Sequence, residues 1–158
     1  YFDVDLSGTM LVSQNVIPFF QKNGGGSIVN ISSTYGILSP DQSLYQIFNK
    51  KSNSKKKKSD VTIEKPIGYS VSKSGVLNLT RFLATRFALD KIRVNTLTLG
   101  GVYDNNPDEF VKLYSKKTPM GRMANKNEYV GPLLFLVSDM SSYMTGSNLI
   151  VDGGWSAW

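Results

Sequence analysis

Apolar residues recur every three or four positions in two long segments of the chain, 5–23 and 67–89. This spacing places them on one face of a helix, so both segments are predicted to be helical. Pro18 interrupts the first pattern and predicts a kink or an early break, because proline cannot donate the helical hydrogen bond. Asn23 and the glycines 24–26 follow, a combination that is typical of a helix end.

Three short runs of mainly β-branched and other apolar residues predict buried strands at 27–32, 92–99 and 148–151. Two shorter helical patterns, 107–117 and 126–138, lie between the last two strands. This alternation of helices and strands predicts an α/β fold with a parallel sheet. Three strands are few for a sheet with both faces covered, so we expect part of a doubly wound sheet rather than all of one.

The segment 34–66 shows no sustained period and is predicted to be a long loop. Its residues 50–58 hold six Lys and no acid. The net charge of +6 comes entirely from this run, because the other residues include 12 basic and 12 acidic side chains. We interpret the run as a solvated loop. A nucleic-acid surface is the alternative, but such surfaces spread basic charge over a folded face, and residues 52–54 interrupt the run. We therefore expect no nucleic-acid partner.

The chain contains no Cys and no His. This excludes thiolate and imidazole metal sites, disulfides and every Ser-His-Asp triad, and no metal site is expected. Acid and base chemistry must then come from Tyr, Lys, Asp, Glu or Ser. The lack of Cys fits a cytoplasmic protein, and no apolar stretch is long enough to predict a membrane span. The first residue is Tyr1 rather than Met, so we expect the chain to begin after processing or partway through a longer protein.

Tyr69 and Lys73 lie four residues apart in the second long helix, so their side chains project from the same face. An ammonium close to a phenol stabilises the phenolate, and such a pair can pass a proton to or from a substrate oxygen. An ordinary surface pair on an amphipathic helix is the alternative interpretation.

Hydroxyl side chains cluster at residues 32–35, directly after the first predicted strand. Ligands of open α/β sheets bind beyond the carboxyl ends of the strands. Ser33 is therefore a candidate for substrate contact. The alternative is that these polar residues only end the strand and contact no ligand.

Together these features resemble the short-chain dehydrogenase/reductase family, and the resemblance extends over nearly the whole chain in order. The details of 98–103 and 147–155 look most like the branch that includes flagellin-modification oxidoreductases. The segments that carry the family resemblance are 5–9, Ser33, Tyr69 with Lys73, 93–95 with Gly100, 119–123, 138–139, 143–146 and 151–154.

The resemblance implies a Rossmann-type fold and hydride transfer between NAD or NADP and a carbonyl or alcohol carbon of a small molecule. Tyr69 would transfer the proton, Lys73 would support it and hold the nicotinamide ribose, and Ser33 would bind the substrate oxygen. Asp5 stands where the family has its proton-relay Asn. The implied cofactor contacts are Asn30, Ile31, Tyr69, Lys73, Gly100 and Val102.

The chain departs from the family pattern in its ends and turns. The N-terminal half with its Gly-rich turn is missing, and the glycines 24–26 do not replace it because they precede a strand. Asp5 is a carboxylate and cannot donate as an amide does. Leu99 replaces the usual Pro, and Asp104 stands where a Thr is usual. We expect residues 1–158 to be the C-terminal part of one such domain.

The connection between Ser33 and Tyr69 has 35 residues, more than is usual in the family. It contains a Lys-rich insertion at about 38–66, which must emerge next to the site because it leaves and returns there. The insertion is interpreted as a solvated spacer. The alternative is a basic lip that attracts an anionic substrate such as a nucleotide-linked sugar.

Two functions stay open at this point. One is an NAD(P)-dependent oxidoreductase, and the other is a truncated, non-catalytic remnant that serves only in binding or oligomerisation. In the resembled family the helices 5–23 and 67–89 pair into homodimers, and the C-terminal end often forms homotetramers. Trp155 and Trp158 are predicted to be buried at such a subunit contact, with folding back onto their own domain as the alternative.

Overall fold

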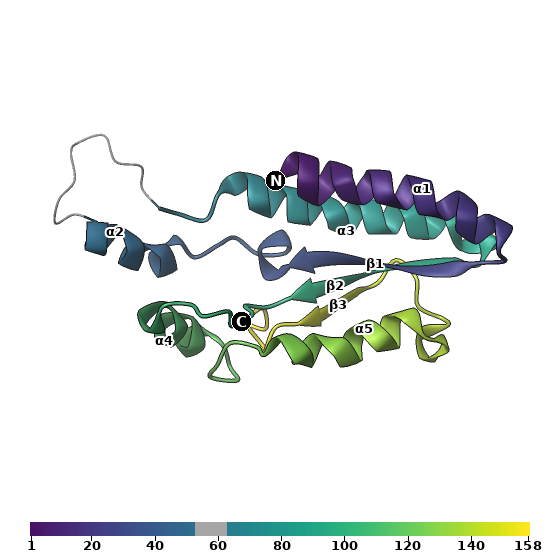
Figure 1. The fold of residues 1–158 in the computed structure, drawn as a ribbon. Helices are drawn as coiled ribbons and strands as arrows, with labels where there is room; N and C mark the ends of the chain where they lie inside the picture. The colour runs from purple at the N-terminus through teal and green to yellow at the C-terminus, as the bar shows by residue number, and fades with distance from the viewer. Residues whose placement is uncertain (53–62) are drawn as a thin grey trace.

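The computed structural model describes residues 1–52 and 63–158. Within this part of the chain lies a parallel sheet of three strands in the order β1–β2–β3 (Figure 1). The strands are β1 (Gly26–Ser33), β2 (Ile92–Leu99) and β3 (Asn148–Val151). The predicted strands and their parallel arrangement are confirmed. Ser33 and Leu99 pair at the ends of β1 and β2, so the carboxyl ends of these strands meet at one edge.

Helices cover both faces of this sheet (Figure 1). One face carries α1 (Thr9–Lys22) and α3 (Ile67–Phe87), and the other carries α5 (Val130–Val137). Beyond the carboxyl ends of the strands lie α2 (Gln46–Ser52) and α4 (Asp108–Lys117). The α/β fold is thereby confirmed. A π-helix at Phe2–Gly8 precedes α1, and 3₁₀ turns occur at Thr34–Gly36, Gln42–Tyr45, Ala88–Asp90, Lys126–Tyr129 and Asp139–Ser141.

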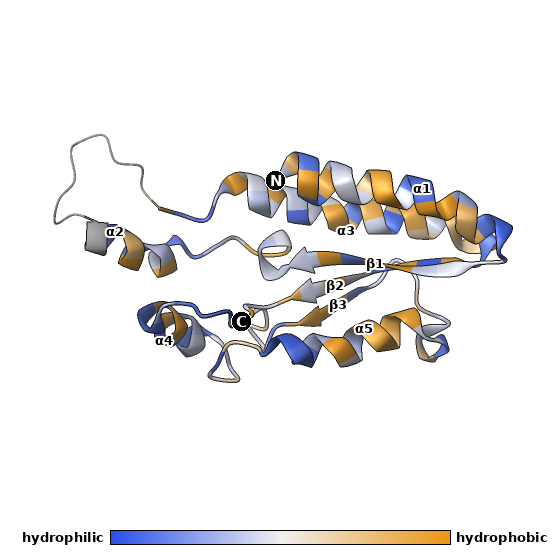
Figure 2. Ribbon diagram, in the orientation of Figure 1, coloured by the Kyte–Doolittle hydropathy of each residue, from blue (hydrophilic) through white to orange (hydrophobic). Residues whose placement is uncertain are grey.

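One core cluster lies between β2 and the helices α1 and α3. Ile17 of α1, Leu83 of α3 and Val94 of β2 are buried together there. Apolar and polar residues alternate along both helices, as expected for helices with one face against a sheet (Figure 2). This packing fixes α3, and therefore the helix face that carries Tyr69, against the sheet.

Helix α1 continues past Pro18 to Lys22, so the early break, one of the two outcomes that the sequence predicted, does not occur. Pro18 lies on the exposed side of the helix. A carbonyl that loses its hydrogen bond there can bind water instead, which removes much of the cost of an internal proline. The helix ends at Asn23 as predicted, and Gly24 follows with a φ of 84°, a conformation that favours glycine.

The segment 34–66 is not simply a long loop, contrary to the prediction. It contains two 3₁₀ turns and α2, and its residues Leu44 and Ile47 are buried with Phe110 and Tyr114 of α4. The apolar residues 44, 47 and 48 have helical spacing, but they form a single turn beside the Lys-rich run, too short to stand out as a period. The remaining residues 53–62, with most of the Lys run and the predicted basic lip, lie outside the described residues.

The described helices include none that is both long and apolar enough to cross a bilayer.

Candidate active site

A cavity of about 300 Å³ opens at the carboxyl ends of β1 and β2. This is the edge where ligands of parallel α/β sheets bind. The first turns of α3 form one wall of the cavity, and the 3₁₀ turn after β1 and the helix α4 contribute others. The lining residues include six of the predicted site residues: Ile31, Ser33, Tyr69, Lys73, Gly100 and Val102.

Tyr69 and Lys73 reach this cavity from the same face of α3, one turn apart. The Lys73 ammonium lies 5.9 Å from the centre of the Tyr69 ring. It also donates a hydrogen bond of 3.3 Å to the carbonyl oxygen of Ile31 in β1. The strand thus orients Lys73, and the helical spacing then places Tyr69 beside it.

Asp5 forms an ion pair with Lys73, with 3.2 Å between Oδ1 and Nζ. The two side chains are mostly buried, with exposed fractions of 21% for Asp5 and 14% for Lys73. An Asn at this position could not neutralise the ammonium. The structure therefore shows Asp5 as a direct charge partner of Lys73, close to the predicted site.

Ser33 ends β1 and caps the 3₁₀ turn Thr34–Gly36. Its Oγ accepts a hydrogen bond of 3.3 Å from the backbone N–H of Tyr35. The hydroxyl proton of Ser33 is not used in that contact and stays available for a substrate oxygen. Cap and substrate contact are therefore compatible roles for this side chain.

Asn30 does not line the cavity, although it was predicted as a cofactor contact. Its side chain is buried against α3 and donates a hydrogen bond of 2.8 Å to Thr80. Thr96 of β2 donates to the same hydroxyl. Successive residues of a strand face opposite sides of the sheet, so Asn30 and Ile31 point to different surroundings.

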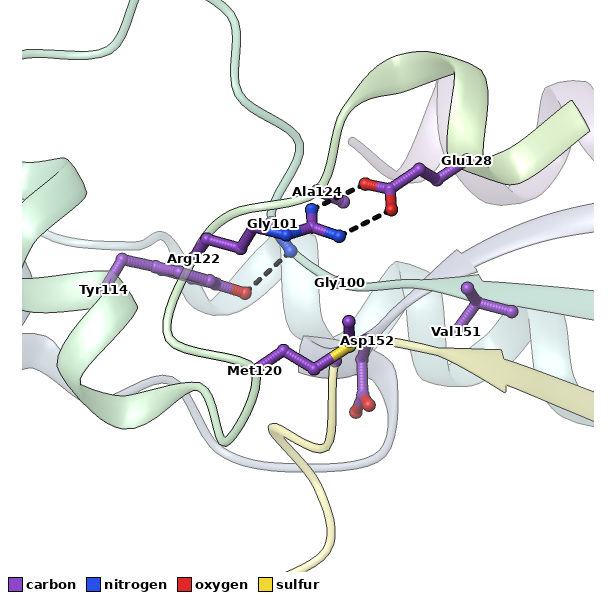
Figure 3. Close-up of a pocket in the computed structure, with 10 residues that line it drawn as sticks. Gly100, Gly101, Tyr114, Met120, Arg122, Ala124, Glu128, Val151 and Asp152 are labelled. Carbon is purple, nitrogen blue, oxygen red and sulfur yellow. Dashed lines mark hydrogen bonds and ion pairs between the residues drawn. The ribbon is translucent and has the colours of Figure 1, made fainter.

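Gly100 and Gly101 make a tight turn directly after β2. The backbone N–H of Gly101 donates a hydrogen bond of 2.7 Å to the Tyr114 hydroxyl (Figure 3). A Cβ at Gly101 would lie 2.4 Å from the Tyr114 ring, and one at Gly100 would lie 2.7 Å from Cα of Asp152. Both glycines are therefore required for α4 and the C-terminal turn to approach the strand end.

A smaller cavity of about 60 Å³ lies next to this turn. Figure 3 shows Arg122 and Glu128 paired at its edge, with Asp152 on the other side. Neither Tyr69 nor Lys73 lines it. We therefore place the candidate chemistry in the larger cavity.

Trp155 folds back onto its own chain, so the prediction of a subunit contact is wrong for this residue. The carboxylate of Asp152 accepts hydrogen bonds from the N–H groups of Gly154 and Ser156 and shapes the C-terminal turn. The Trp155 ring then stacks on Tyr114, with 4.2 Å between ring centres. Burial raises the pKa of Tyr114 to about 12.

Trp158, the other tryptophan of the C-terminal end, is 80% exposed within the chain.

Several cavity residues were not among the predicted site residues. Lys65 is the most important, because its ammonium lies 3.9 Å from the centre of the Tyr69 ring. Its position four residues before Tyr69 was the available signal, but Pro66 separates it from the helical pattern. The other missed lining residues include Tyr35, Tyr45, Phe110, Tyr114 and Met123.

Two tyrosines line the cavity: Tyr35 from the turn after β1 and Tyr45 from the insertion. Burial raises the pKa of Tyr35 and of Tyr45 above their usual value, and their hydroxyls lie 3.4 Å apart. These two phenols therefore stay protonated at neutral pH and do not compete with Tyr69 as bases.

Family models match both parts of the chain. Residues 1–46 match the model for short chain dehydrogenase, and residues 54–156 match the model for enoyl-(acyl carrier protein) reductase. The chain belongs to the short-chain dehydrogenase/reductase family. The family resemblance expected from the sequence is thereby confirmed.

Similar proteins include the post-translational flagellin modification protein A of Campylobacter coli, which is 35% identical over 97% of this chain and 55% of its own length. A short-chain dehydrogenase structure from Leptospira borgpetersenii with bound NAD+ is also 35% identical, with a TM-score of 0.84. The match covers 98% of this chain and 54% of the Leptospira chain. A gluconate 5-dehydrogenase structure from Burkholderia cenocepacia, in complex with NADP and tartrate, is 26% identical, with a TM-score of 0.80. That match covers 99% of this chain and 55% of the Burkholderia chain. This chain thus spans about half the length of these relatives.

The residues present fit the nicotinamide end of such a cofactor. The Lys73 ammonium and the Tyr69 hydroxyl can donate hydrogen bonds to ribose hydroxyls, and the cavity that they line has room for a ring. In residues 1–52 and 63–158, no Gly-rich turn leads from the end of a strand directly into an α-helix. The glycines 24–26 lie at the opposite end of β1 from Ser33. The described part of the chain therefore offers contacts for nicotinamide but no cradle for the pyrophosphate.

Proposed function

We propose that this chain supplies the substrate side of an NAD(P)-dependent oxidoreductase that interconverts a secondary alcohol and a carbonyl compound. The observation that supports this most directly is the meeting of Ser33, Tyr69 and Lys73 around one cavity at the carboxyl end of the sheet. The family membership and the bound NAD+ or NADP of solved relatives support the same reaction class.

In the proposed oxidation, Ser33 donates a hydrogen bond to the substrate oxygen and fixes its position. Tyr69 accepts the hydroxyl proton as the C–H bond breaks, and in the reverse reaction it returns that proton to the oxygen. Lys73 stabilises negative charge on the Tyr69 oxygen and donates to the nicotinamide ribose. NAD(P), when bound, supplies the hydride acceptor or donor.

Asp5 has a positioning role in this proposal. Its carboxylate and the Ile31 carbonyl hold the Lys73 ammonium from two sides. An ammonium held in this way keeps one orientation toward the cavity, which lowers the cost of ordering it when a ligand binds. The proton relay of the family's Asn is thus replaced by a charge pair.

The substrate in this proposal is a small polar molecule with a secondary alcohol or a ketone. The relatives named above and the D-arabinitol 2-dehydrogenase of Candida tropicalis, which is 36% identical, differ in what they act on, so the family alone does not select one. The resemblance to the flagellin modification protein favours a sugar derivative, including a nucleotide-linked sugar.

The substitution Tyr69→Phe tests the proposal because it keeps the ring and removes only the proton-transferring group. In the product of the complete reading frame, we expect turnover of a polyol panel with NAD+ or NADP+ to fall roughly 10²- to 10⁴-fold, the usual contribution of a general acid or base. Dinucleotide affinity, measured by calorimetry, should stay within about threefold.

Tyr143→Phe is the matched control, since Tyr143 is fully exposed and does not line the cavity. It should leave turnover unchanged. Normal turnover in Tyr69→Phe would rule out Tyr69 as the acid or base. Absence of turnover and of dinucleotide binding in the unmodified protein would favour the non-catalytic alternative.

A further inference from the structure

A second ammonium, that of Lys65, stands in the candidate cavity. Its Nζ lies 3.9 Å from the ring centre of Tyr69 and 5.8 Å from that of Tyr35. The ammonium of Lys73, which is paired with Asp5, lies 5.9 Å from the same Tyr69 ring centre. The cavity therefore presents two cations beside the residue that is proposed to carry out proton transfer.

Two side-chain amides hold the backbone around Lys65. Gln42 accepts from the N–H of Lys65 at 2.9 Å and donates to its carbonyl at 3.0 Å. Asn49 makes the same pair of bonds with Ile63, at 2.7 and 2.9 Å. Pro66 then restricts the backbone at the start of α3. This double clamp fixes the segment that carries Lys65 instead of leaving it as a free loop end.

The charge of Lys65 is not neutralised by any acid in the described parts of the chain. In residues 1–52 and 63–158, the ion pairs join Lys73 to Asp5, Lys117 to Asp41 and Arg122 to Glu128. Burial lowers the pKa of the Lys65 ammonium, the nearby Lys73 lowers it further, and Asp5 partly opposes both effects. The half-buried ammonium faces two aromatic rings and has no carboxylate paired with it in the described residues, so a bound anion would stabilise it.

We propose that Lys65 binds an anionic group of the substrate, a carboxylate or a phosphate, while the reacting carbon lies at Tyr69. The inference rests on the proposed function for the identity of the reacting group. The observation behind the inference is the position of the ammonium near two rings of the cavity wall. Hydrogen bonds from Gln42 and Asn49 fix the backbone that holds it there. Lys65 is then the specificity-determining residue that selects acidic substrates over neutral ones.

Three six-carbon probes of matched skeleton test this selection: gluconate with a carboxylate, glucitol 6-phosphate with a phosphate, and neutral glucitol. Binding is measured by calorimetry in the product of the complete reading frame, with and without NADH. These probes are alcohols or hydroxy acids, so NADH gives no turnover with them. The readout thus measures binding and not catalysis.

Lys65→Met removes the charge and keeps an unbranched side chain. We expect it to weaken binding of the preferred anion roughly 10- to 100-fold, the value of a charge-assisted hydrogen bond, and to leave glucitol unaffected. Lys65→Arg should retain the affinity within about threefold. Lys65→Gln serves as a second neutral variant should the Met variant fold poorly. Lys22→Met, at the far end of α1, is the control for loss of one positive charge.

The two anionic probes distinguish a carboxylate site from a phosphate site. The proposal is wrong if neither anion binds the unmodified protein more tightly than glucitol, or if the neutral variants weaken all three probes equally. The binding assay needs no turnover and Tyr69→Phe retains Lys65. Failure of this inference and failure of the proposed function are therefore separate results.

Discussion

The Arg122–Glu128 pair shows how one carboxylate can organise a helix start. The Glu128 carboxylate accepts hydrogen bonds of 2.6 and 2.7 Å from the two terminal guanidinium nitrogens of Arg122. It also accepts one from the backbone N–H of Asn125. Asn125 in turn caps the same turn, which leads into α5. The hydrogen bonds from Arg122, followed by the one from Asn125, lower the pKa of Glu128 from 4.5 to about 2.

This lowered pKa predicts an acid-sensitive contribution to stability. Because the pKa is lower in the folded state, the contribution is fully present above pH 4.5 and is lost as the pH falls towards 2. We expect Glu128→Gln to reduce the free energy of unfolding at neutral pH, and the difference from the unmodified protein to shrink below pH 4.5. Urea unfolding at a series of pH values measures it.

Arg122→Met provides the control for this prediction, because it removes the other partner of the same interaction. It should lower stability over the same pH range, and the double variant should lose less than the sum of the two single variants. A difference that is constant from neutral pH to pH 3 would contradict the assignment. Both side chains are exposed to solvent, so salt should reduce the effect of the pair.

The sequence predicted most of the candidate site at the level of single residues. Ser33, Tyr69 and Lys73 could be named because strand end and helix spacing determine where their side chains emerge. Lys65 could not be named in this way, because its position depends on hydrogen bonds with the side-chain amides of Gln42 and Asn49, which lie well before it in the chain. The family resemblance implied that Asn30 contacts the cofactor, and the alternation of the strand turns its side chain towards Thr80 of α3.

At the scale of elements, the long helices followed from periodicity and the strands from short β-branched runs, whereas the structure of the insertion followed from neither. Its helix α2 forms against α4, through contacts that no local pattern encodes. Tertiary packing of this kind commonly decides the structure of short helices, which are marginal by themselves. The insertion thereby becomes a wall of the candidate cavity, with Tyr45 and Lys65 facing it.

Leu44→Ala tests whether the insertion is an integral part of the core. Leu44 is 1% exposed and packs in the cluster with Phe110, Tyr114 and Trp155. Truncation of a buried Leu leaves a cavity and typically costs about 2–5 kcal/mol. We expect a loss of that size in the free energy of unfolding, measured by urea titration.

Leu38→Ala is the matched control for this test, because Leu38 lies in the same connection but is 38% exposed. It should cost much less than Leu44→Ala. Equal and small effects of the two substitutions would show that the insertion is only loosely attached to α4.

At the scale of the whole molecule, α1 and α3 carry several large apolar side chains that are exposed. Phe19 is 61% exposed and Phe82 is 63% exposed, although both are large apolar side chains. Leu11, Val12 and Val71 of the same helices are also exposed. The two helices lie side by side on one face of the sheet (Figure 1), and exposed apolar side chains on neighbouring elements are typical of an interaction site.

We expect a second copy of the chain to cover this surface, because homo-oligomers with a two-fold axis are the commonest assemblies of soluble proteins. The product of the complete reading frame should sediment as a dimer or a larger even-numbered species. Phe82→Glu places a charge in the expected contact and should shift the equilibrium towards monomer. Tyr143→Glu, at an exposed position outside these helices, is the control and should leave the equilibrium unchanged. A protein that sediments as a monomer before any substitution would contradict the prediction. A dimer that persists in Phe82→Glu would place the contact elsewhere, with exposed Trp158 at the C-terminal end as the next surface to test.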